Sequence, residues 1–365
     1  MRLFLFEFKK MTGSRGMLLL ILLLMVINFA KISIFVHYNP MLGVSRTNSK
    51  DQTVRLYQKK YEGKITEKSA RKVIEGYEAC ERFMQGTGEY NEEDEFCFQI
   101  YPLYKYQYTY HMVLQDRLDD ASENTKFYRS KSNFYEAERN ELIRKIYSGR
   151  EIDSYYDSED FYYLFAYHFS TLLLVLFALI LSYQFFYMEK ENGMYQMLIS
   201  LGKNRRTVFT KKYLNLIFGI FLVGTVLYLQ DYILFGNLLH LRGILNPVYA
   251  IQSYSDSPFD MTILQYYLLI CGIRMGIVLL ISLVFVFVEQ WFSGKILPVA
   301  AGGVVAVAVV LTGDHYFNLE SYGMKLHVIS LWNHPCPAGF VWLAVYGILL
   351  VILSVLVYRS FRIHN

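Results

Sequence analysis

Two charged residues lie within otherwise apolar stretches and are the first candidates for chemistry. Arg274 falls near the middle of the apolar run 263–288, and Asp231 lies near the end of the run 213–235. A charge in the hydrocarbon core of a membrane costs about 2.5–3.5 kcal/mol on insertion scales. The pattern fits two roles. Either the two side chains line or gate a translocation path, or Arg274 reaches outward to Asp231 in a structural ion pair between neighbouring helices.

The elements that would position these charges are apolar segments. Hydrophobic residues make up 54% of the 365 residues and charged residues 19%, which excludes an ordinary cytosolic enzyme, a disordered chain and a disulfide-built mini-protein. The net charge of +4 is too small to indicate nucleic-acid binding. A membrane-spanning helix needs about 20 mostly apolar residues. We identify six candidate segments: 17–36, 161–188, 213–235, 263–288, 296–311 and 338–357.

The fifth segment is the shortest of these candidates. It has 16 residues and contains Pro298 and the pair Gly302-Gly303. A half-span or a short tilted helix is therefore the alternative there.

Charge distribution gives the orientation. With the N-terminus inside, the short cytoplasmic flanks carry thirteen Lys and Arg residues, against two in the outer loops 236–262 and 312–337. Cytoplasmic loops are the ones enriched in Lys and Arg. Residues 38–160 carry 19 Lys and Arg against 23 Asp and Glu, a net charge of −4. We therefore place this block outside a plasma membrane, with both termini in the cytoplasm.

The outer block is predicted to be mainly helical. Apolar residues at spacings of three and four indicate helical stretches over about 50–84 and 110–147. Between them, the alternating tyrosines at 104, 106, 108 and 110 suggest a short strand or an extended aromatic strip. That strip is either a docking surface for an extracellular ligand or simple core packing between the two helices.

Two cysteines of the outer block are a disulfide candidate. Cys80 and Cys97 are separated by sixteen residues around Gly86-Thr87-Gly88, and the outer compartment is oxidising. Two unpaired thiols are the alternative.

No residue pattern indicates catalysis or a cofactor. Gly294-Lys295 lacks the upstream glycine spacing of a P-loop, so we do not expect this chain to hydrolyse ATP. Zinc signatures, haem motifs and catalytic triads are also missing from the sequence. We therefore predict a protein that is not an enzyme and that has no metal site of its own.

The cytoplasmic stretch after the second span has a distinct pattern. Acidic residues lie directly after the second predicted span, and Asn192-Gly193 predicts a turn. Residues 194–201 then predict a short amphipathic helix, which Gly202 can end. A basic run then leads into the next span. Such a helix suits a lever that docks on a soluble partner. An ordinary positively charged loop is the alternative.

This stretch resembles the loop of ABC transporter permeases of the type-2 exporter family. The resemblance rests on Glu191-Asn-Gly193, an apolar turn and Ser200-x-Gly202-x-x-Arg205-Arg206, followed by Lys before the next span. The layout of one span, a large outer domain and five more spans is similar over nearly the whole chain. The family often has Pro where Gly202 stands here. The resemblance implies that this loop is a coupling helix that contacts a separate ATPase through Glu189, Glu191, Asn192, Gly193, Met197, Leu198, Gly202, Arg205 and Arg206.

The sequence thus predicts an all-α polytopic membrane protein with six transmembrane helices and a mainly helical extracellular domain between helices 1 and 2. The expected parts are an interfacial elbow helix (1–16), helix 1 (17–36), the outer domain (37–160), helix 2 (161–188), the coupling loop (189–212), helices 3–6 (213–358) and a cytoplasmic tail (359–365). The elbow helix is itself implied by the resemblance. A merely basic flank is the alternative.

The expected function is export coupled to ATP hydrolysis in a partner subunit, which would bind ATP and Mg. A second permease copy, identical or related, and membrane lipids are the other expected partners. The substrate would be a hydrophobic or amphipathic peptide, antimicrobial, lipid or drug. The alternatives are a mechanotransmission permease, a class that usually has four spans, and a membrane sensor or receptor whose outer domain binds a ligand.

Overall fold

The structure, a computed structural model, describes residues 15–38, 62–86, 97–156, 158–188, 192–193, 205–289, 300, 302, 304 and 326–364. Within these ranges it gives no account of the side chains of residues 77, 80, 83–84, 97–105, 205 and 361–364. The described chain is mostly helical, and its strands form two small antiparallel pairs.

Five described helices are long and apolar enough to cross a membrane. They are α2 (Arg15–Tyr38), the unit Phe161–Met188, α12 (Arg205–Leu239, apolar from Arg206), α13 (Ile263–Glu289) and α15 (Ala338–His364, apolar to Ser360). These helices confirm five of the six predicted segments and support a membrane protein. The predicted segment 296–311 lies outside the described residues except at 300, 302 and 304.

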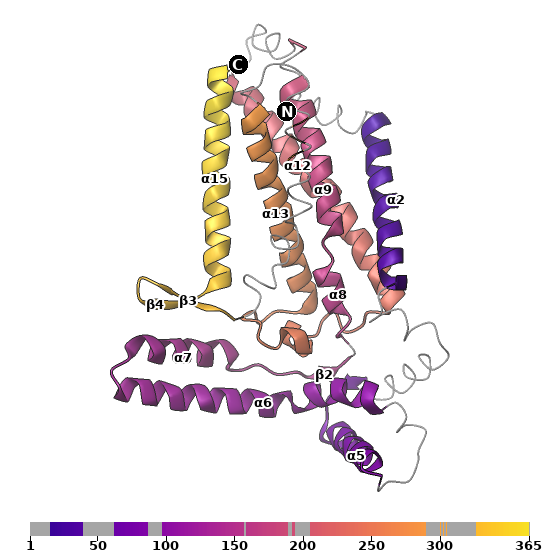
Figure 1. Cartoon of the computed structure of the whole chain (residues 1–365), viewed down its shortest axis with the longest axis vertical. Helices are drawn as coiled ribbons and strands as arrows, with labels where there is room; N and C mark the ends of the chain where they lie inside the picture. Colours follow the sequence, from indigo (N-terminus) through magenta and orange to yellow (C-terminus); the bar gives the residue numbers. More distant parts are fainter. Residues whose placement is uncertain are drawn as a thin grey trace.

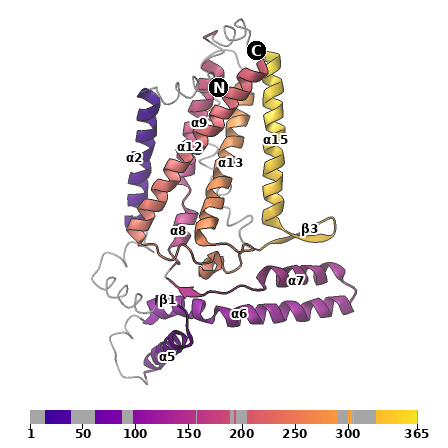
Figure 2. The same cartoon turned by 180° about the vertical axis from the view of Figure 1, so that it is seen from behind.

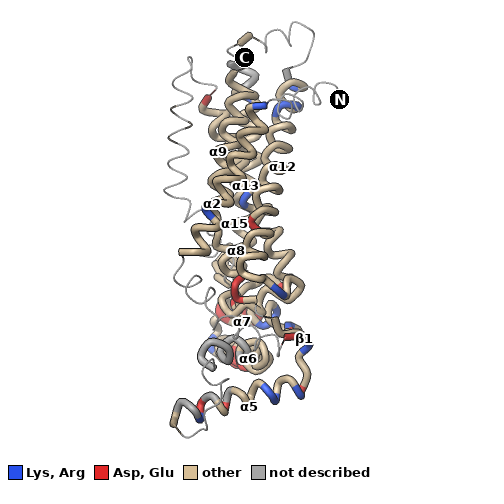
Figure 3. The backbone as a smooth tube through the Cα atoms, turned by 90° about the vertical axis from the view of Figure 1, so that its right-hand side faces the viewer, with Lys and Arg blue, Asp and Glu red and all other residues tan. Residues whose placement is uncertain are grey.

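The spans form a bundle whose centre is the Phe161–Met188 unit. Its helix α9 (Phe169–Ser182) packs against α12 and α13, with α2 on one side and α15 on the other (Figures 1 and 2). The core is apolar, with Leu174, Phe177, Leu216 and Val278 completely buried. Most charged residues lie toward the two ends of the molecule (Figure 3). This is the distribution expected of helices that cross hydrocarbon.

The ends of the spans alternate along the chain. The N-terminal end of α2, the end of α13 at Glu289 and the C-terminal end of α15 lie at the upper end of the bundle in Figure 1. The start of α13 and the start of α15 at Ala338 lie at the lower end, beside the polar helices.

Residues between the first two spans form a layer across the lower end of the bundle. Helices α6 (Cys97–Ser130) and α7 (Phe134–Tyr147) make an antiparallel hairpin that runs across the axes of the spans (Figures 1 and 2). The helical stretch predicted at 110–147 is therefore two helices. The reversal occurs where Ser132 takes a φ of +56° and Asn133 caps α7 by accepting from the Glu136 N–H at 3.3 Å.

The stretch predicted as one helix from 50 to 84 begins later than expected. Residues 50–61 lie outside the description, and Gly63–Lys64 form strand β1, paired with β2 (Ser154–Tyr155). Gly63 has a φ of +123°, which a helix does not allow. Helix α5 (Glu67–Met84) starts only after Thr66, whose hydroxyl accepts from the Ser69 N–H at 3.2 Å.

The tyrosine strip was predicted as extended but is helical. It forms the first part of α6, where Tyr106 and Tyr110 share one face. The Tyr108 and Tyr110 side chains are only 4% exposed. They stack on Tyr155 and Tyr249, with ring centroids 5.8 and 5.3 Å apart. A docking surface on these two rings is thereby contradicted. Their stacking partners come from β2 and the α12–α13 loop, and Tyr110 also lies in a buried cluster with Tyr147 of α7.

The layer formed by α5, α6, α7, β1 and β2 is named the outer layer after its position away from the bundle, and the α12–α13 loop connects the two. This loop contains the short 3-10 helices η3 (Val248–Ala250) and η4 (Gln252–Tyr254). Tyr106 donates to the Tyr249 carbonyl at 2.6 Å, and Gln107 donates to the Ala250 carbonyl at 2.9 Å. A hairpin of β3 (Val328–Leu331) and β4 (His334–Pro337) lies beside α7. The outer layer is thus attached to the bundle through side chains that satisfy loop carbonyls.

Candidate functional site

The second predicted span is interrupted near the end that adjoins the layer of α6 and α7. Helix α8 (Phe161–Ala166) ends at Tyr167, whose ψ of 118° is extended, and α9 begins after His168. An interruption frees backbone carbonyls that hydrocarbon cannot satisfy. Arg274 of α13 supplies the donors: its terminal nitrogens lie 2.5 Å from the Phe165 carbonyl and 2.6 Å from the Tyr167 carbonyl. Arg274 therefore closes the break between the two helices.

Asp231 is the acceptor at the centre of a polar cluster from three spans. Its carboxylate accepts from Asn28 Nδ2 of α2 at 2.7 Å and from the Ser170 hydroxyl of α9. The residue is only 2% exposed. Among the described residues, no Lys, Arg or His forms an ion pair with this carboxylate. It is therefore held by neutral donors within the apolar bundle.

The predicted ion pair between Arg274 and Asp231 is not formed. The guanidinium instead donates to the two carbonyls at the break. The two residues belong instead to one hydrogen-bonded chain: Arg274 binds the Tyr167 carbonyl, the Tyr167 hydroxyl donates to Asn28 Oδ1 at 3.0 Å, and Asn28 donates to Asp231. Their assignment to a translocation path or gate stays a prediction.

Sequence reasoning missed three members of this cluster: Asn28, Tyr167 and Ser170. Asn28 is completely buried, and an amide in the middle of the apolar run 17–36 was a signal that could have indicated it. Tyr167 and Ser170 carried no comparable signal, because hydroxyl residues are common in apolar segments. Among the described residues, no group of His, Cys, Asp and Glu side chains could hold a metal ion.

The opposite end of the second span has a different irregularity. Residues Tyr183–Met188 form a π-helix, η2, and Lys212 of α12 donates to the Phe185 carbonyl in it at 2.5 Å. The predicted turn at Asn192-Gly193 is present: Gly193 has a φ of +65° and the Asn192 N–H donates to the Met188 carbonyl at 3.0 Å. Single-turn π-helices are frequent at functional sites.

Most of the predicted coupling residues lie outside the description. These are Glu189, Glu191, Met197, Leu198 and Gly202. The structure includes the backbone of Arg205 as the first residue of α12, and the Arg206 side chain is exposed in its first turn. The helix thus takes in residues 205–212, which were predicted as part of the loop.

The disulfide prediction is likewise untested. Cys80 lies in α5 and Cys97 begins α6, but both side chains are outside the description. Of the other cysteines, Cys271 is a buried free thiol and Cys336 is a partly buried one.

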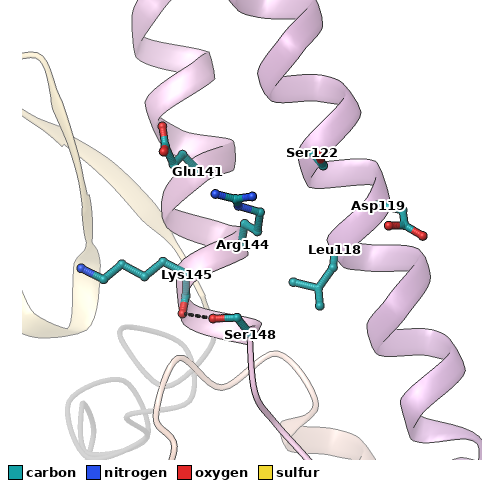
Figure 4. Close-up of a pocket in the computed structure, with 7 residues that line it drawn as sticks. All are labelled: Leu118, Asp119, Ser122, Glu141, Arg144, Lys145 and Ser148. Carbon is teal, nitrogen blue, oxygen red and sulfur yellow. Dashed lines mark hydrogen bonds between the residues drawn. The ribbon is translucent and has the colours of Figure 1, made fainter.

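The outer layer contains a groove between α6 and α7 (Figure 4). Its volume is about 570 Å³, and charges of both signs line it: Asp119, Glu141, Arg144 and Lys145. In Figure 4, Arg144 points toward α6 near Leu118, and Asp119 points away. Glu141 is bound to Arg129 at 2.6 Å. The mixed lining gives no preference for one sign of ligand charge.

Comparisons with known proteins add no further assignment. No protein-family model matches the chain, and neither does any curated protein or solved structure.

Proposed function

We propose that this chain is the membrane-spanning permease of an ATP-driven exporter, in which a separate ATPase subunit binds residues 189–206. The observation that carries the proposal is the position of the two elements that flank residues 189–204. η2 ends and α12 begins at the end of the bundle that also holds the N-terminal end of α2 and the C-terminal end of α15, opposite the outer layer (Figure 1). A soluble ATPase would need access to this end.

The alternation of span ends supports a six-span permease. The end of α13 and the start of α15 lie at opposite ends of the bundle (Figure 1), which one further span between them would account for. A Cβ at Gly302 would lie 3.1 Å from the Phe285 ring of α13, and this proximity of Gly302 to α13 supports a span there. Five described spans already exceed the four that are usual in mechanotransmission permeases.

The geometry suggests how a push on the loop would reach the polar cluster. Loop residues 189–204 are joined directly to the π-helix on one side and to α12 on the other. Ser170 lies on α9, which continues from the π-helix, and Asp231 lies on α12. A displacement of the loop would therefore act on both partners of the Ser170–Asp231 hydrogen bond. ATP binding would bring two ATPases together and drive this motion, and hydrolysis would reset it.

The substrate class follows from the surroundings of the cluster. A mostly apolar bundle with a few neutral hydrogen-bond donors suits a hydrophobic or amphipathic molecule such as a peptide, lipid or drug. Two permease copies would enclose the path. The α6–α7 groove favours a second candidate, a sensor that binds its ligand outside, but a sensor needs no ATPase on the loop.

The test is affinity purification of the chain from its native membrane in mild detergent, followed by mass spectrometry. We expect a stoichiometric P-loop ATPase. Replacing Arg205 and Arg206 with Glu should remove that ATPase, because the charge of the docking surface is reversed.

The matched control is the pair Arg359→Glu and Arg362→Glu. It makes the same change in charge at the same end of the bundle but outside the loop, so the ATPase should remain bound. Loss of the ATPase from both double variants would indicate a general charge effect. Recovery of the wild-type chain without an ATPase in several detergents would contradict the exporter and favour the sensor.

A further inference from the structure

Arg150 is a buried cation at the junction between the outer layer and the bundle. It follows α7 after Gly149, whose φ of +78° turns the chain back toward the α12–α13 loop. The guanidinium carbon lies 4.5 Å from the ring centre of Tyr147 and 4.9 Å from that of Tyr249. Arg150 is 2% exposed. The side chain thus sits between a ring of the outer layer and a ring of the loop.

The hydrogen-bonding capacity of this guanidinium is unused by the described protein. Its Nε and both terminal nitrogens are buried, and none has an acceptor among the described residues. The carbonyls nearby are already engaged: Tyr249 accepts from Tyr106, and Glu151 accepts from the Tyr249 hydroxyl at 3.2 Å. The hydroxyl of Tyr110, whose ring stacks on Tyr249, is also buried without a partner.

No carboxylate of the described residues is bound to Arg150. Arg117, on the ring of Tyr147 at 4.8 Å, is bound to Asp256 at 2.8 Å, so that acid neutralises a different cation. Asp260 is exposed and acts on Tyr110 and Tyr249 only through space.

The tyrosines do not supply a negative charge either. Burial raises the pKa of Tyr110 and of Tyr147 above the ordinary value. Arg150 opposes the rise at Tyr110, although the two groups do not form a hydrogen bond of ordinary geometry. Both phenols therefore stay neutral at physiological pH.

A buried guanidinium with neither acceptor nor counter-charge is strongly unfavourable, because desolvation of an ion costs several kcal/mol. Contacts with aromatic rings recover only part of this, about 0.5–2 kcal/mol. A water molecule would satisfy N–H groups but would leave the charge uncompensated.

We propose that Arg150 and the Tyr110 hydroxyl bind one small monovalent anion, chloride, at this junction. All four donor atoms are buried from water, so a single halide requires less displacement of the surrounding side chains than a carboxylate or phosphate would. Both donors belong to the outer layer, and both pack on the ring of Tyr249 in the loop between α12 and α13, so the anion neutralises a cation that lies between the layer and the bundle. Chloride thereby strengthens the attachment of the outer layer, whatever substrate the protein handles.

The test is the thermal stability of the purified full-length protein as chloride replaces gluconate at constant ionic strength. The wild-type Tm should rise with chloride and then saturate. In Arg150→Met this dependence should vanish, and the variant in gluconate should be at least as stable as the wild type. In Tyr110→Phe the half-saturating chloride concentration should rise about tenfold or more, since one donor to the anion is lost.

Arg144→Met is the matched control, because it removes an exposed cation of the α6–α7 groove close to the same helix end. Its chloride dependence should equal that of the wild type. Two outcomes would overturn the proposal: a wild-type Tm that is the same in chloride and gluconate, or a chloride dependence that persists in Arg150→Met. The first needs no variant, so poor folding of a mutant leaves the test intact.

Discussion

Arg274 and Arg150 are buried to nearly the same extent, with 3% and 2% of their surface exposed, yet their surroundings are opposite. Arg274 gives both terminal nitrogens to carbonyls at 2.5 and 2.6 Å, and only its Nε has no acceptor. Arg150 gives none of its nitrogens to the described protein. Arg274 lies within the membrane-spanning bundle, and Arg150 lies at the junction with the outer layer.

The difference follows from whether the backbone carbonyls at each site already have hydrogen-bond donors. In the bundle, the break between α8 and α9 exposes carbonyls that lipid cannot satisfy, so the carbonyls and the arginine need each other. At the outer junction the corresponding carbonyls already have donors, for example Tyr106 on Tyr249 and Gln107 on Ala250. Arg150 therefore has no acceptor among the residues that the structure describes. It remains available to an anion from the aqueous side.

The largest expected effect is that of Arg274→Met. Methionine fills much of the same space but leaves two buried carbonyls without donors, which should lower the free energy of unfolding by about 2–6 kcal/mol. Thermal unfolding in detergent measures this loss. Arg274→Lys, which keeps the charge and some donors, should recover part of it. A Tm for Arg274→Met close to that of the wild type would show that the break does not depend on this residue.

The sequence identified Arg274 and Asp231 but not their relation. Apolar run lengths predicted five of the described spans, since crossing hydrocarbon imposes length and composition. Run lengths did not reveal the break at Tyr167, because the residues on both sides of the break are apolar. The group that stabilises the break is Arg274, which lies on a different helix and donates to its carbonyls. Spacing likewise misassigned the tyrosines of α6. Alternating residues read as a strand, whereas contacts with Tyr155 and Tyr249, distant in sequence, stabilise the helix.

A smaller effect on stability is expected for Asp231→Asn, with a larger one on function. Asparagine keeps the shape and one acceptor oxygen, so the free energy of unfolding should fall by only about 1 kcal/mol. If the charge of the cluster serves export, coupled transport should drop several-fold at near-normal expression. Ser170→Ala removes a neighbouring hydrogen bond without changing the charge and is the matched control. Normal transport by Asp231→Asn would show that the charge of this cluster is not needed for export, and its role would then be structural.

The smallest expected effect is a response of the outer junction to alkaline pH. Burial raises the pKa of Tyr106, Tyr110, Tyr147 and Tyr249 above the ordinary value of 10.0. A tyrosine released from the junction ionises first as pH rises past that value. The contribution of these phenols to the attachment is therefore complete below pH 10.0 and is lost as pH rises through their folded-state values.

Spin labels at Ser132, on the tip of the α6–α7 hairpin, and at Leu238, near the outer end of α12, would report the separation. Their distance distribution should broaden above pH 10.0. The same rise in pH should leave the contacts of Arg274 intact, because backbone carbonyls do not titrate. A pair of labels across α8 and α13 serves as the comparison. Equal broadening of both distance distributions would contradict the view that titratable phenols hold the junction at Arg150 whereas carbonyls that do not titrate hold Arg274.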